Sequence, residues 1–197
     1  MKIITIPGGS LYTNCYMAFA ENSDTCVLID PGFDAEQILE KVRSQGKTVE
    51  AIFLTHGHFD HIGGVKEIAP QTGCKVYIHE ADLELPSQLT VGTIPCTDCY
   101  EDGDTVTAAG LTFEVLHTPG HTPGGVCLLC EEAMFAGDTL FAGTCGRTDL
   151  PGSSPRQMRD SLSRLAKLEK NYRVLPGHGI YSTLDMEKRT NPYLQWN

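Results

Sequence analysis

The sequence predicts an α/β fold on the strength of two observations. Short runs rich in β-branched and aromatic residues recur along the chain, and glycine, proline or polar turn residues bound them. Two other segments carry apolar residues at helical spacing behind a capping side chain. With 197 residues, of which 41% are hydrophobic, the chain suits a single domain, 1-197, around one substantial core.

The expected strands follow one another through most of the chain. Their alternating or continuous apolar patterns place them near residues 3–6, 14–20, 25–29, 50–54, 75–79, 112–116, 126–129 and 133–135, with a short extended run at 173–175. A helix is expected soon after the fourth strand, over residues 61–68.

Two further helices are expected from the residues of their first turns. One should begin at Asp34, whose carboxylate can cap the backbone, with Gln37 three residues later. The other should begin at Ser154 and Pro155, because proline suits the first helical position. The residues expected on their buried faces are Ile38, Leu39 and Val42 in the first helix and Met158, Leu162 and Leu165 in the second.

A dense group of polar donors follows the fourth strand. His56, His58, Asp60 and His61 place three imidazoles and one carboxylate within six positions, more than a packed core would hold. In extended backbone alternate side chains share a face, which directs His56, His58 and Asp60 to one side. His61, in the helix that follows, can face a second ion. The segment therefore predicts a metal site.

Three later residues can complete that site. His121, Asp138 and His178 each lie in a loop that follows a strand and contains glycine. Loops at the ends of strands bring together residues that are distant in the sequence, so we expect these donors to converge on the first group.

Charge and hydropathy limit the partners. A net charge of -10 disfavours a nucleic acid, because affinity for a phosphate backbone depends on lysine and arginine. The sequence contains no run of about 18 apolar residues and no basic N-terminal stretch followed by an apolar one. We therefore expect a cytoplasmic protein without a membrane partner, acting on a small molecule.

The eight cysteines and the two remaining histidines are expected to be structural. Cys96 and Cys99, with Cys127 and Cys130, have the spacing of a zinc ribbon. The second pair lies in an expected strand, however, where its sulfur atoms would point to opposite faces. Small buried residues are thus the better interpretation of these thiols. The two histidines, expected to make ordinary hydrogen bonds, are His79 and His117.

The order of the donors resembles the metallo-β-lactamase superfamily. The pattern His56-x-His58-x-Asp60-His61, followed by a distant His, Asp and His, matches the ligand motifs of that family over most of the chain. Asp30, in Asp30-Pro31-Gly32, resembles the element that supports the metal loop. The resemblance implies an αββα sandwich of two mixed β-sheets with outer helices and with the ligands at one edge.

The resemblance also implies a dinuclear centre. In the family pattern one ion is held by His56, His58 and His121, the other by Asp60, His61 and His178, and Asp138 bridges them. A hydroxide between the ions would attack a carbonyl group, so Asp60 and Asp138 count as catalytic through the ions that they hold. Zinc is the first expectation for the two divalent metal ions, with iron and manganese as alternatives.

The segment 143–149 resembles the Gly-Arg element of glyoxalase II enzymes, which hydrolyse hydroxyacylglutathione thioesters. This favours a short, single-domain thioesterase of the hydroxyacylglutathione hydrolase-like kind, without the C-terminal helical domain that binds glutathione in two-domain relatives. Whether glutathione is recognised stays open. Arg147 could contact an anionic substrate or could form an ion pair with Asp149. Cys145 is expected near the substrate.

Other functions fit parts of the same pattern. A mononuclear iron enzyme resembling persulfide dioxygenases would use two histidines and one carboxylate as a facial triad. It would leave the second set of ligands without a metal, which counts against it. A different acyl or lactone hydrolase, and a module that binds metal without turnover, are further alternatives. The absence of an export signal disfavours a β-lactam substrate.

Overall fold

The computed structural model describes residues 1–90 and 92–195, and it contains two six-stranded mixed sheets. The first sheet has the order β1-β2-β3-β4-β5-β6. Its first three strands pair antiparallel, and β3 to β6 pair parallel. The bounds of its strands are β1 Lys2–Gly8, β2 Thr13–Phe19, β3 Thr25–Ile29, β4 Thr48–Phe53, β5 Lys75–His79 and β6 Asp98–Tyr100.

The second sheet has the order β14-β13-β10-β9-β8-β7. All its neighbours pair antiparallel except β10 and β13, which run parallel. A separate hairpin, β11 and β12, follows β10 along the chain. The bounds are β7 Thr105–Ala108, β8 Leu111–His117, β9 Val126–Cys130, β10 Ala133–Gly137, β11 Leu140–Phe141, β12 Thr144–Cys145, β13 Arg173–Pro176 and β14 Ser182–Thr183.

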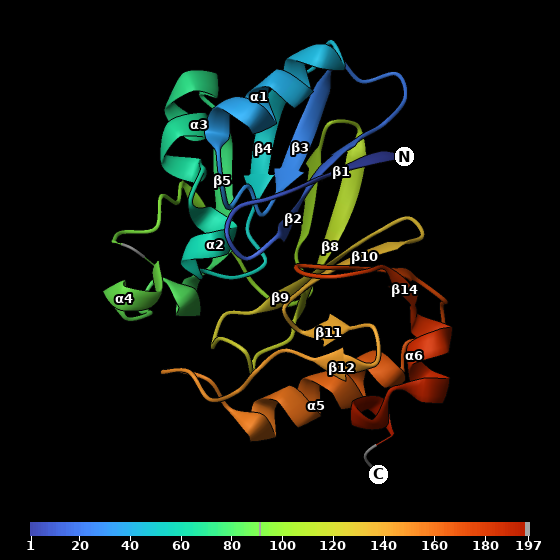
Figure 1. The fold of residues 1–197 in the computed structure, drawn as a ribbon. Coiled ribbons are helices and arrows are strands. Elements are labelled where there is room, and N and C mark those ends of the chain that lie inside the picture. Colours follow the sequence, from blue (N-terminus) through green and yellow to red (C-terminus); the bar gives the residue numbers. More distant parts are fainter. Residues whose placement is uncertain (91, 196–197) are drawn as a thin grey trace.

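Helices cover the outer faces, which confirms the expected αββα sandwich. In Figure 1, α1 and α3 flank strands β3 to β5, whereas α5 and α6 lie at the opposite end of the view, next to β11 and β12. The bounds are α1 Ala35–Ser44, α2 Phe59–Ile62, α3 Val65–Thr72, α4 Ser87–Thr90, α5 Pro155–Ala166 and α6 Leu184–Thr190, with short 3-10 turns η1 Glu80–Asp82 and η2 Pro192–Leu194.

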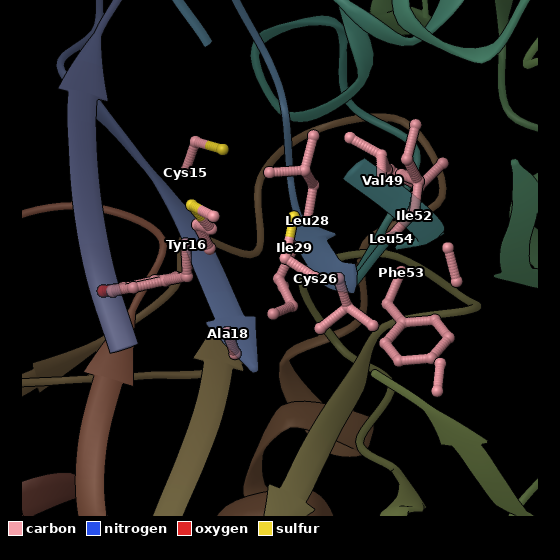
Figure 2. Close-up of a cluster of buried hydrophobic side chains, with 14 of the residues drawn as sticks. Cys15, Tyr16, Ala18, Cys26, Leu28, Ile29, Val49, Ile52, Phe53 and Leu54 are labelled. Atoms are coloured by element: carbon pink, nitrogen blue, oxygen red, sulfur yellow. The ribbon is translucent and has the colours of Figure 1, made fainter. Parts of the chain in front are cut away.

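Alternation along the second sheet divides the buried side chains between two clusters. In β10, Phe135 packs in the central cluster between the sheets, whereas Met134 packs against α5 on the other face. Phe135 meets Tyr16 of β2 edge to face, with ring centroids 5.4 Å apart, so aromatic side chains join the two sheets. Figure 2 shows the buried side chains that β2, β3 and β4 contribute to the central cluster.

Both capped helices form as expected. The carboxylate of Asp34 accepts from the backbone N–H of Gln37 at the start of α1, and the hydroxyl of Ser154 accepts from that of Gln157 at the start of α5. Such caps stabilise a helix by roughly 1 kcal/mol. All six apolar residues expected on the faces of these two helices are buried.

The single helix expected over residues 61–68 is wrong. The chain forms two short helices, α2 and α3, with Gly63 and Gly64 between them. A Cβ atom at Gly63 would lie 2.5 Å from the carbonyl oxygen of Gly32, and one at Gly64 would lie 2.6 Å from that of Phe33. The backbone after Asp30 therefore packs directly against this break. Among the described residues, no helix is long and apolar enough to cross a membrane.

Candidate metal centre and active site

Three histidines from two loops form the first group of donors. His56 and His58 follow β4, and His121 lies in the loop between β8 and β9. One nitrogen atom of each lies within 4.8 Å of the others, so the three could hold a metal ion. The closest pair is Nδ1 of His58 and Nε2 of His121, 2.9 Å apart. All three side chains are buried.

A second group contains a carboxylate. Asp60 and His61 lie in α2, and His178 follows β13; the three also offer ligand atoms within 4.8 Å of one another. The Oδ2 atom of Asp60 is 3.1 Å from Nε2 of His178 and 3.5 Å from Nε2 of His61. The expected extended backbone at Asp60 is wrong, because α2 already begins at Phe59. In this helix the Asp60 carboxylate contacts His178.

Asp138 lies between the two groups. Its Oδ2 atom is 3.4 Å from Nε2 of His121, and its Oδ1 atom is 3.5 Å from Nε2 of His61. The neighbouring Gly177 permits this position, since a Cβ atom there would lie 2.3 Å from Asp138 Oδ1 and 2.6 Å from a ring carbon of His61. One carboxylate thus contacts donors of both groups.

Three buried polar atoms of these donor residues have no hydrogen-bond partner. Among the described residues, the buried side-chain nitrogen and oxygen atoms without a hydrogen-bond partner are Nε2 of His56, Nε2 of His58 and Oδ1 of Asp138. Buried polar atoms are rarely left unpaired in folded proteins. Imidazole and carboxylate donors suit zinc, iron and manganese, so the residues fit the metal centre that the sequence predicts.

Hydrogen bonds fix the orientation of several of these rings. Nδ1 of His61 lies 2.9 Å from Asp30 Oδ2, Nδ1 of His121 lies 2.8 Å from the carbonyl oxygen of Arg147, and Nδ1 of His178 lies 3.1 Å from that of Leu11. Each of these rings can donate its Nδ1 proton there and keep the lone pair of Nε2 for an ion.

The two groups differ in charge when no ion is present. Burial lowers the pKa of His56, and the neighbouring imidazoles lower it further. Burial and His121 lower the pKa of His58 to about 3. Burial also acts to lower the pKa of His61, but the surrounding carboxylates, Asp138 foremost, outweigh it and raise this pKa to about 9. Near pH 7, His56 and His58 are therefore neutral, whereas His61 is protonated.

Asp30, which the sequence motif placed behind the metal loop, contacts both that loop and His61. Its carboxylate accepts from the backbone N–H of Thr55 at 2.7 Å and from the hydroxyl of Thr55 at 2.6 Å, besides contacting His61. Asp30 has a φ of 51°, a left-handed conformation that is uncommon outside glycine. The carboxylate thus connects the end of β3 with the start of the metal loop.

Sequence reasoning missed Asp82, a second supporting carboxylate. It is fully buried at the end of η1, where its Oδ2 atom accepts from the N–H of Gly57 at 2.8 Å and from the hydroxyl of Thr122 at 2.9 Å. Its Oδ1 atom accepts from the N–H of Gly124. Asp82 therefore joins the loop of His56 and His58 to that of His121. Its place just after β5 was the available signal, since Asp138 also follows a strand.

A cavity of about 610 Å³ opens onto the donors. Both residues that we expected near the substrate, Cys145 and Arg147, line it. The guanidinium of Arg147 forms two hydrogen bonds of 2.7 Å with the carboxylate of Asp149, so of the two expectations for this side chain the structure has the ion pair. The thiol of Cys145 is half-buried, and burial raises its pKa.

The other cysteines and histidines lie outside this arrangement. All eight cysteines are free, and no described cysteine belongs to a group of three or more metal-binding side chains. The rings of His79 and His117 stack with centroids 4.1 Å apart. His79 accepts from the N–H of Ala81, and His117 contacts the carbonyl oxygen of Pro123. Their hydrogen bonds are ordinary structural ones, as expected.

Comparison with known proteins finds related sequences over most of the chain. Residues 8–178 match the family model described as the metallo-beta-lactamase superfamily. Hydroxyacylglutathione hydrolase GloC of Haemophilus influenzae is 32% identical over 209 residues, which cover 98% of each protein.

Solved structures with a similar fold carry different names. The B3 metallo-beta-lactamase BLEG-1 is 34% identical, with a TM-score of 0.89, and the match covers 99% of this chain and all of that one. TTHA1623, solved in a di-iron-bound form, is 38% identical, with a TM-score of 0.84 and coverage of 97% and 100%. ETHE1 from Myxococcus xanthus is 30% identical, with a TM-score of 0.85 and coverage of 98% and 84%.

Proposed function

The chain belongs to the metallo-beta-lactamase superfamily, and we propose that it is a dinuclear metal-dependent hydrolase that cleaves a small thioester. One observation carries the dinuclear part of the proposal. The two groups of donors lie on either side of Asp138, whose carboxylate contacts a histidine of each. A site for a single ion would not need both groups.

The residues have separate tasks in this proposal. His56, His58 and His121 would hold one ion, while Asp60, His61 and His178 would hold the other, with Asp138 between them. Bound divalent ions supply an activated water and stabilise the negative charge that develops on a carbonyl oxygen.

The protein itself positions these groups. The hydroxyl of Thr13 donates to Asp60 Oδ2 at 3.2 Å, and Asp30 and Asp82 hold the loops that carry the histidines. No side chain is required as nucleophile. A thiolate leaves readily without prior protonation, so the site needs no dedicated acid for a thioester.

Thioester hydrolysis is supported by similarity along the whole chain. The 32% identity to hydroxyacylglutathione hydrolase GloC covers 98% of both proteins, and the segment 143–149, which resembles glyoxalase II, lines the cavity with Thr144, Cys145 and Arg147. The di-iron form of TTHA1623 supports iron as an alternative to zinc for the ions.

Elemental analysis combined with a thioester panel tests the proposal. We expect about two divalent ions per chain and hydrolysis of at least one small thioester. His121→Ala and Asp138→Ala should each lose more activity than the roughly 10–100-fold that is typical when a residue hydrogen-bonded to a metal ligand is removed. Circular dichroism of both variants controls for folding. One equivalent of iron, with oxygen consumed in the presence of a persulfide, would instead establish the oxygenase alternative.

A further inference from the structure

The cavity over the metal donors has mostly apolar walls. Five apolar side chains line it, and they come from five separate places in the sequence: Leu11, Phe59, Leu89, Phe141 and Leu150. Leu11 is 51% exposed and Phe59 is 41% exposed, so apolar surface at the cavity faces water in the free protein. Such surface around a few convergent polar groups is typical of a site that a ligand covers.

The guanidinium at the cavity is already paired with a carboxylate. Among its described lining residues, Arg147 is the only arginine or lysine, and its two hydrogen bonds go to Asp149. The hydrogen bonds and the charge of Asp149 raise the pKa of Arg147, and Arg147 in turn lowers that of Asp149. An anionic substrate would have to displace the Asp149 carboxylate before Arg147 could bind it.

These two observations concern the substrate of the hydrolase proposed above, and the inference rests on that function. We propose that the physiological substrate is a thioester whose acyl group is apolar and uncharged. The acyl chain covers the five apolar side chains of the cavity, and Asp149 disfavours anionic substrates by neutralising Arg147.

The reaction is ordinary hydrolysis. Water adds its oxygen to the acyl carbon, the carbon–sulfur bond breaks, and the products are a carboxylic acid and a thiol that takes up the remaining proton. Each methylene that moves from water into the cavity contributes ~0.8 kcal/mol, which is about fourfold in kcat/KM when the gain is kept in the transition state.

A series of acyl groups on one thiol tests the apolar site. With acetyl, butyryl and hexanoyl thioesters of N-acetylcysteamine, we expect kcat/KM of the metal-loaded protein to rise about fourfold per methylene until the cavity is full. Thioether analogues of the same series, which cannot be hydrolysed, should show the same rise in affinity by calorimetry. A flat series in both measurements contradicts the inference.

Variants of the cavity wall make this test specific. Leu89→Ala and Phe141→Ala should each flatten the dependence on chain length. The matched control is Met186→Ala, because Met186 is exposed on α6 and does not line the cavity. If Met186→Ala has the same effect as Phe141→Ala, the apolar side chains of the cavity do not bind the acyl group.

Asp149→Asn tests the role of charge. Wild-type protein should prefer butyryl to succinyl thioesters, and the substitution should raise the ratio of succinyl to butyryl kcat/KM by about two- to fivefold, as expected for an exposed ion pair. An unchanged ratio means that Asp149 does not set the preference.

A glutathione substrate is the competing outcome. Lys66, which lines a neighbouring cavity of about 410 Å³, is the side chain that could then bind a carboxylate of the tripeptide. The inference is wrong if lactoylglutathione is hydrolysed faster than lactoyl-N-acetylcysteamine and Lys66→Ala abolishes that difference. If no thioester is hydrolysed, the proposed function fails, while binding of the thioether series still decides whether the cavity takes an apolar chain.

Discussion

The half of the candidate metal centre that holds three histidines is more deeply buried than the half that holds Asp60. His56, His58 and His121 are 2–6% exposed, whereas in the other half His61 is fully buried and the side chains of His178 and Asp60 are 26% and 13% exposed. In the first half, burial lowers the pKa of His56 and His58, whereas in the second half the surrounding carboxylates raise the pKa of His61. The comparison indicates that one cavity edge contains two different electrostatic environments.

The two halves differ in one support and share another. Asp82 joins the two loops of the three-histidine half, whereas Asp30 contacts both Thr55, at the start of the first of those loops, and His61 in the other half. Buried carboxylates that each hold several hydrogen bonds preorganise the ligands around them. If the halves are separate ion sites, they should respond separately to substitution.

Removing one ligand from each half gives the largest expected effect. His58→Ala and His178→Ala should each leave about one ion per chain. Each should also reduce thioesterase activity by well over the roughly 100-fold that is the largest effect typical of a residue hydrogen-bonded to a metal ligand. Elemental analysis after dialysis measures the ions. Loss of both ions in both variants would show that the centre binds its metals as one unit.

Asp82→Ala should have the next largest effect, and it should weaken ion binding in the three-histidine half only. The substitution leaves the N–H groups of Gly57 and Gly124 without their acceptor, at a cost of about 1–3 kcal/mol each in the free energy of unfolding. We expect affinity for the ion of the three-histidine half to fall roughly 10–100-fold, as measured by competition with a chelator.

Ser154→Ala is the control for that measurement. It removes the cap of α5, which should lower the free energy of unfolding by about 1 kcal/mol without touching either group of donors. Metal affinity that falls equally in both variants would mean that stability, rather than the loops that Asp82 joins, sets the affinity.

The smallest expected effect is a difference between the two halves in how pH changes the stability of the metal-free protein. The pKa of His61 rises from 6.5 to about 9 on folding, so its contribution to stability is complete below about pH 6.5 and is lost as the pH rises toward 9. The pKa of His58 falls to about 3, so the unfolded chain takes up a proton that the folded chain does not, and stability decreases as the pH falls below about 6.5.

Urea unfolding in the presence of a chelator measures both effects. His61→Gln should remove the loss of stability between about pH 6.5 and 9, and His58→Gln should reduce the loss below about pH 6.5. A profile that is identical for wild type and both variants would contradict the charge difference between the halves.

Local signals in the sequence predicted some parts of this molecule well. A cap acts within one turn, so Asp34 and Ser154 identified the starts of α1 and α5. The spacing of His56, His58 and His61 was dense enough to indicate a metal site by itself. The sandwich followed from the resemblance in motif order, because strand patterns alone do not say which strands pair.

Features that depend on distant contacts were not predictable in the same way. The break at Gly63 and Gly64 exists because another segment of backbone packs against it, and that contact leaves no mark in the local pattern. Short strands such as β7 and β14 form through their neighbours in the sheet rather than through strong propensity. Asp82 looks like an ordinary turn residue until its three donors are known.

The loop of His178 is held by the opposite end of the chain. The side-chain amide of Asn14 donates to the carbonyl oxygens of Pro176 and Gly179, at 3.1 Å each. The hydroxyl of Tyr16 donates to the carbonyl oxygen of Pro176 at 2.6 Å, and Thr13 forms a β-bridge with His178. During synthesis the first of these residues leave the ribosome long before the last, and closing so long a loop is slow. A nascent chain can therefore complete its set of metal ligands only after His178 has left the ribosome, so metal loading should follow the synthesis of β13 rather than guide early folding.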